Sequence, residues 1–122
     1  MSALEGSLEA RYGRRTVNAL LAFEEFASQA GRLVARGRLA YDADEMLRLA
    51  ADAIVVKLGE SVTRMDASFL TDHPQLPLRL IKDMRTLVAH EYDAIRPGLV
   101  WNTLERDLPP VAMAIADVLD RS

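Results

Sequence analysis

The residues best suited to chemistry are three polar side chains in the second half of the chain. The segment MRTLVAHEY, residues 84–92, brings Arg85, His90 and Tyr92 into otherwise apolar sequence. An imidazole, with an ordinary pKa of about 6.5, accepts a proton from a ribose 2′-hydroxyl at neutral pH. A guanidinium stabilises the negative charge that develops on the phosphate as the 2′-oxygen attacks. These residue types therefore suit RNA cleavage without a metal ion.

Helical periodicity places the three side chains on two edges of one helix. At about 100° per residue, Arg85 and Tyr92 lie on the same side of the apolar stripe, and His90 lies on the other side. The three groups meet if the helix ends before His90, or if a second copy of the helix packs beside it across a two-fold axis. The apolar stripe that we expect to be buried consists of Leu80, Ile81, Met84, Leu87 and Val88.

Other polar residues could support the same site. Arg79 and Lys82 share one side of the helix with Arg85 and form a small basic stripe that could hold an RNA backbone. Glu60, which follows Gly59, could form a hydrogen bond near Arg85 if their helices are adjacent. The alternative to a functional role is that each of these residues simply belongs to a solvated helix face or to a hydrogen-bonded edge of the core.

Neither a metal site nor a cofactor is expected. No group of carboxylates has the spacing of a cation cage. The chain has 2 histidines and no cysteine, and His73 stands before Pro74 in a predicted loop, so a zinc site is not indicated.

Composition predicts one all-α domain comprising residues 1–122. Of the 122 residues, 50% are hydrophobic, and Ala, Leu, Arg and Glu are abundant while aromatic residues are few. The net charge of −3 gives no global attraction for a polyanion, so any RNA binding must be local. We find neither a signal peptide nor an apolar run that could cross a membrane, and we expect a cytoplasmic protein.

The first half of the chain predicts two helices. The first begins near Ser2 or Ser7 and ends near Arg36, with Gly13 and Gly31 as candidate interruptions. The second begins with the capping-box pattern Asp42-x-x-Glu45 and continues through Gly59 towards Met65. Its predicted buried face consists of Met46, Leu49, Ala50, Ala53 and Val56.

The second half predicts the remaining elements of a four- to five-helix bundle. Residues 66–77 are rich in cap and turn residues and are expected to form a loop, with Pro77 opening the third helix. A fourth helix is predicted over 99–108, with Trp101 in the core. The Pro109-Pro110 pair is expected to break this helix and to open a fifth over 110–120.

The motif and its flanks resemble the HepT-like branch of the HEPN superfamily. The pattern Arg85-x4-His90-x-Tyr92 is preceded by LPLRLIKDM and followed by VWNTLERDLPPV. Upstream, LGESV at 58–62 resembles the Gly-Glu segment on the family's second helix. The resemblance covers residues 42–120, and the preceding part matches only as a generic first helix.

This resemblance implies a fold, an activity and two partners. The fold would be an all-α HEPN-type bundle that forms a homodimer with the motif helices at the interface. The protein would be a toxin and a metal-independent endoribonuclease with Arg85 and His90 as the catalytic pair. Its partner would be an MntA-type nucleotidyltransferase antitoxin that attaches AMP to Tyr92. Thr86 occupies a position where the family often has asparagine, and its hydroxyl can still donate or accept a hydrogen bond.

Two other classes of function remain open from sequence. A non-catalytic HEPN module would bind a nucleotide or a nucleotidyltransferase, as Thr86 and the low positive charge would allow. A helical oligomerisation protein would have no site, and Arg85 would then contribute only to stability.

Overall fold

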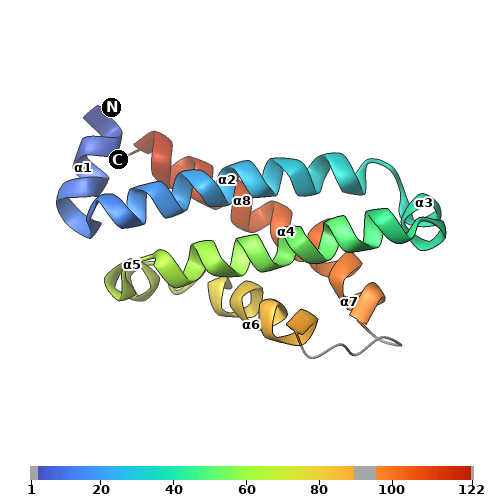
Figure 1. The fold of residues 1–122 in the computed structure, drawn as a ribbon. Helices are drawn as coiled ribbons and strands as arrows, with labels where there is room; N and C mark the ends of the chain where they lie inside the picture. The colour runs from blue at the N-terminus through green and yellow to red at the C-terminus, as the bar shows by residue number, and fades with distance from the viewer. Residues whose placement is uncertain (1–2, 90–95, 122) are drawn as a thin grey trace.

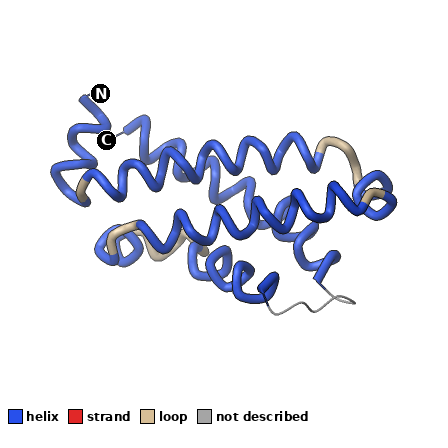
Figure 2. Tube along the Cα trace, viewed as in Figure 1, coloured by secondary structure: helices blue, strands red, loops and turns tan. Residues whose placement is uncertain are grey.

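A computed structural model describes residues 3–89 and 96–121. His90 and Tyr92 lie outside the described residues. Every element described within these ranges is a helix (Figure 2), which confirms the predicted all-α class. The elements are α1 (Ala3–Tyr12), α2 (Arg14–Val34), α3 (Arg38–Ala43), α4 (Glu45–Arg64), α5 (Ala67–Asp72), α6 (Leu78–Ala89), α7 (Arg96–Asn102), the π-helical η1 (Thr103–Asp107) and α8 (Leu108–Arg121).

The two long helices α2 and α4 lie side by side and run in opposite directions, joined by the short α3 (Figure 1). Helix α6 packs against α4, and α8 packs against α2. Helix α1 lies at the end of the bundle where α8 also finishes (Figure 1). The arrangement is a helical bundle in which α4 contacts both α2 and α6.

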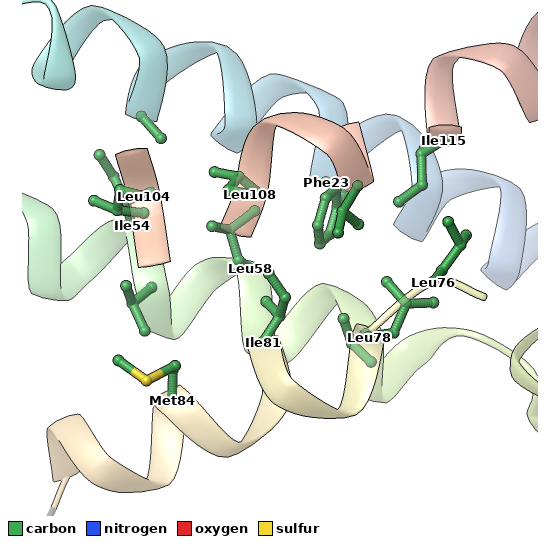
Figure 3. Packing of buried hydrophobic residues seen from close by; sticks show 14 of the residues in the cluster. Phe23, Ile54, Leu58, Leu76, Leu78, Ile81, Met84, Leu104, Leu108 and Ile115 are labelled. Atoms are coloured by element: carbon green, nitrogen blue, oxygen red, sulfur yellow. The ribbon is translucent and has the colours of Figure 1, made fainter. Parts of the chain in front are cut away.

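One hydrophobic core joins these helices. Phe23 of α2, Leu58 of α4 and Leu108 of α8 are almost completely buried and point towards one another (Figure 3). Helix α6 contributes Leu78, Ile81 and Met84 to the same cluster. Trp101 is also buried, as predicted, with 3% of its surface exposed.

The predicted buried face of α4 is wrong. Met46 and Leu49 are 70% and 54% exposed, Ala50 and Ala53 are exposed, and Val56 is only partly buried. Helix α4 has apolar residues on two faces, and α2 and α6 pack against the face that was not predicted to be buried. The face that enters the core consists of Ala51, Ile54, Val55, Leu58 and Val62.

The chain starts α4 two residues later than the capping-box pattern predicted. Asp44, in extended backbone conformation, is the N-cap, and its side chain accepts a hydrogen bond from the Met46 amide at 2.9 Å. Asp42 belongs to α3, where its carboxylate pairs with Arg38 at 2.9 Å. The prediction failed because Gly37, with φ of 90°, restarts a helix before Asp42 is reached.

One of the two candidate interruptions of the first predicted helix is confirmed: Gly13, whose φ is 92°, divides it, whereas α2 continues through Gly31. Two other expectations need correction. The predicted loop at 66–77 contains α5, which Asp66 caps by accepting from the Ser68 amide. Pro109 and Pro110 lie inside the first turn of α8, which follows η1 directly, so a wider π-helical turn replaces the expected break.

The apolar stripe of α6 is partly as predicted. Ile81 and Met84 are buried, and Leu87 and Val88 are partly buried. Leu80 is 45% exposed and does not belong to the core. Among the described residues, no helix is long and apolar enough to span a bilayer.

Candidate functional site

Arg85 lies where α6 makes its closest approach to α4. A Cβ built on Gly59 of α4 would be 2.7 Å from the Arg85 Cβ and 3.2 Å from its Cδ. Apolar carbon atoms prefer a separation of about 3.5–4.0 Å, so no residue other than glycine fits at position 59 without moving a helix. The Cβ of Arg85 is fixed by its own backbone and cannot rotate away. Gly59 therefore allows α6 to bring the arginine directly onto α4.

The guanidinium of Arg85 is available for a ligand. Arg85 is partly buried, and its Nη1 donates a long hydrogen bond of 3.4 Å to Thr63 Oγ1. Thr63 lies four residues after Gly59, one helical turn further along α4. A guanidinium has five N–H donors, and among the described residues this bond uses one of them. An arginine whose aliphatic carbons are packed and whose guanidinium makes a long hydrogen bond is suited to binding a phosphate.

The other described residues of the predicted site lie on the same two helices, α4 and α6. Arg79 and Lys82 are exposed on α6, and Thr86 is an exposed neighbour of Arg85 on the same helix. Glu60 lies on α4 beside Gly59, and the packing of α4 against α6 confirms that the two helices are adjacent. Its carboxylate is 3.9 Å from Lys57 Nζ and 4.0 Å from an Arg64 nitrogen, both on its own helix.

The second half of the predicted motif cannot be placed. His90 and Tyr92 lie outside the described residues, so the structure gives no distance from either side chain to Arg85. Within residues 3–89 and 96–121, no three potential metal ligands gather into a cluster.

Sequence reasoning missed a surface next to the site. We name the four exposed apolar residues Met46, Leu49, Ala50 and Ala53, together with the partly buried Val56, the outer face of α4. Val56 precedes Gly59 by one helical turn, so the outer face borders the position of Arg85. Contiguous exposed apolar surface commonly marks a contact with another protein. The sequence analysis named these same residues as an apolar stripe but expected the core to cover them.

The fold and the arginine contact define a class, namely an all-helical bundle in which an arginine on a late helix packs directly against a glycine of α4. Comparison with known families agrees with this class. The family described as Ribonuclease HepT-like matches residues 23–118, which is most of the chain. The protein belongs to this HepT-like ribonuclease family.

Comparison with individual proteins finds a relative in Caldanaerobacter subterraneus subsp. tengcongensis, named "Putative RNase TTE0752". The two sequences are 25% identical over 64 residues, which cover 52% of this chain and 57% of the relative. The chain therefore spans little more than half the length of that relative. No solved structure matches the chain.

Proposed function

We propose that this protein is the toxin of a HEPN/MNT toxin–antitoxin pair, and that it acts as a metal-independent endoribonuclease. The observation that carries the proposal is the close contact of Arg85 with Gly59, in a chain whose family is HepT-like ribonuclease. We take residues 1–122 to form a single HEPN domain that acts in the cytoplasm.

Arg85 and His90 divide the chemistry between them. The imidazole of His90 takes the proton from a ribose 2′-hydroxyl, and the 2′-oxygen then forms a bond to phosphorus. The bond from phosphorus to the 5′-oxygen breaks, and that oxygen takes a proton from water while the imidazolium returns its own proton to solvent. Arg85 stabilises the charge on the phosphate oxygens during this exchange. The products are a 2′,3′-cyclic phosphate and a 5′-hydroxyl, and no step requires a metal ion.

We further propose that two chains complete the site as a homodimer. The outer face of α4 supports this, because it is apolar, exposed and adjacent to Gly59. A two-fold contact over this face would place the Arg85 residues of both chains near one axis, with the motif helices at the interface. His90 of one chain could then act beside Arg85 of the other.

Residues around Arg85 would bind the RNA strand. Arg79 and Lys82, on the exposed side of α6, would contact phosphates on either side of the cleaved bond. Thr86 and Glu60 would form hydrogen bonds to the ribose or to a base.

The direct test is cleavage of RNA in the presence of EDTA by the wild type and by single variants. We expect Arg85→Ala to lose about 100-fold or more of the rate, the scale seen when one charge-stabilising group is removed. His90→Ala should lose about as much, since general base catalysis contributes 10²–10⁴-fold. Arg32→Ala, which removes an exposed arginine from α2, is the matched control and should cleave normally.

The products and the outcome of the variants decide the proposal. Fragments that end in a 2′,3′-cyclic phosphate would support attack by the 2′-oxygen. Cleavage that stops with EDTA, or that is equal in Arg85→Ala and the wild type, would refute the proposed mechanism. RNA or nucleotide binding without cleavage would favour the non-catalytic HEPN module.

Regulation by the antitoxin is a separate part of the proposal. An MntA-type nucleotidyltransferase would transfer AMP to the Tyr92 hydroxyl, which adds a negative charge near Arg85 and repels RNA. Intact mass spectrometry after co-expression should show one adenylate on the wild type and none on Tyr92→Phe. Adenylate on both the wild type and Tyr92→Phe would show that another residue is modified.

A further inference from the structure

A second candidate site lies at the end of the bundle where α1, the segment after α5 and the end of α8 meet. It is a cavity of about 640 Å³, within the range of about 300–1,000 Å³ that is typical of small-molecule sites. None of the residues around Gly59 and Arg85 lines it. Its polar lining consists of Ser7, Arg11, Tyr12, Gln75, Asp117 and Arg121, together with His73.

One wall of this cavity is aromatic and held rigidly. The His73 ring stacks on Phe69, with centroids 4.2 Å apart and an interplanar angle of 29°. Tyr12 meets the same Phe69 edge to face at 5.2 Å, and its hydroxyl donates to Asp72 at 2.8 Å. The rings of Tyr12 and His73 are tilted by 60° to one another, with centroids 6.2 Å apart, so a flat ligand can stack on only one of them.

The imidazole of His73 has a defined hydrogen-bonding role. Its Nδ1 is 2.9 Å from the carbonyl oxygen of Phe69, and a carbonyl only accepts hydrogen bonds. Nδ1 therefore carries the proton, and Nε2 of the neutral ring remains an acceptor. Gln75, also in the lining, supplies both an amide donor and an acceptor.

Two arginines from opposite ends of the chain flank the wall. Arg11 comes from α1 and Arg121 from the last turn of α8. Arg11 pairs with the exposed carboxylate of Asp72 at 3.4 Å and lies 5.4 Å from the centre of the Tyr12 ring, and Arg121 pairs with the exposed carboxylate of Asp117 at 3.5 Å. Exposed ion pairs of this kind contribute only about 0–1 kcal/mol, so a phosphate can replace them easily. A planar guanidinium also matches two phosphate oxygens at once.

We propose that this cavity binds one nucleotide, with its phosphate between Arg11 and Arg121 and its base against the ring of His73. Gln75 then contacts the edge of the base. The nucleotide is either free in solution or one unpaired nucleotide of an RNA strand, since both present the same base and phosphate. The site is separate from Arg85 and does not depend on whether the protein cleaves RNA.

Calorimetry with the full chain tests the proposal. The probes are AMP, CMP, adenosine, inorganic phosphate and a tetranucleotide RNA, each titrated into the Arg85→Ala variant so that no RNA is consumed. We expect AMP or the tetranucleotide to bind, and adenosine and phosphate alone to bind at least about tenfold more weakly. Binding of AMP identifies a free nucleotide as the ligand, and binding of the tetranucleotide alone identifies RNA.

Variants at the two arginines distinguish this cavity from other surfaces. Both side chains are largely exposed, at 69% and 80%, so Arg11→Ala/Arg121→Ala should fold normally. This double variant should weaken binding about tenfold or more, whereas Arg32→Ala should not change it. No binding of either AMP or the tetranucleotide, or equal binding by the double variant, would overturn the proposal. Loss of RNA cleavage in Arg85→Ala with nucleotide binding retained would show that the two sites are independent.

Discussion

Replacing Gly59 with alanine tests how Arg85 is positioned. The new Cβ would lie 2.7 Å from the Arg85 Cβ. An unstrained contact is about 3.5–4.0 Å, so α6 must move away from α4 by about 1 Å. Overpacking of this kind costs about 1–3 kcal/mol of unfolding free energy. This cost is partly offset, because alanine within a helix is more stable than glycine by about 1 kcal/mol.

Gly31→Ala is the matched control for this experiment. Gly31 also lies within a long helix, α2, but a Cβ built there has no neighbouring atom within 4 Å. Its replacement should stabilise the protein by up to about 1 kcal/mol through helix propensity alone. The gain in propensity is common to both variants, so the difference between them measures the overpacking cost. We expect Gly59→Ala to be less stable than Gly31→Ala by about 1–3 kcal/mol.

The assay is urea denaturation followed by circular dichroism at one protein concentration, since a dimer would make stability concentration-dependent. RNA cleavage should fall about 100-fold in Gly59→Ala, the cost of a misplacement of about 1 Å in a catalytic group. In an Arg85→Gly background, Gly59→Ala should lose its overpacking cost, because the opposing Cβ is gone. Equal stability of Gly59→Ala and Gly31→Ala would refute the close contact on which this reasoning rests.

Three further predictions concern other parts of the chain. Burial, with a smaller effect of Asp120, raises the pKa of Glu24, so the ionised carboxylate destabilises the fold. At neutral pH, Glu24→Gln should therefore increase the free energy of unfolding by about 1 kcal/mol. Denaturation curves should show this increase vanish below pH 4.5, where the carboxyl group is protonated in both the folded and the unfolded state. The Tyr41 hydroxyl donates to the Pro97 carbonyl at 2.9 Å, so Tyr41→Phe should cost about 1–2 kcal/mol in the same assay. Burial raises the pKa of Tyr41 to about 12, so the wild type should lose stability between pH 10 and 12 while Tyr41→Phe lacks this loss. Met46→Glu should dissociate the proposed dimer in sedimentation experiments without unfolding the chain, and Met113→Glu, at an equally exposed position on α8, should not.

The sequence alone determined the helical class and several local features. Periodicity and composition predicted helices for most of the chain, and Gly59 was correctly placed inside the second predicted helix. The motif around Arg85 indicated the family that the comparison confirmed. These features are predictable because they depend on residues that are close together along the chain.

Only the tertiary structure decided which face of α4 is buried and how Arg85 is held. This helix carries two apolar stripes, and periodicity cannot choose between them, because the choice depends on the apolar area that α2 and α6 bury together. In the same way, the sequence contained Gly59 and Arg85 without showing that they touch. Their contact joins residues on separate helices, so it is set by the packing of the whole core and not by the local pattern around either residue.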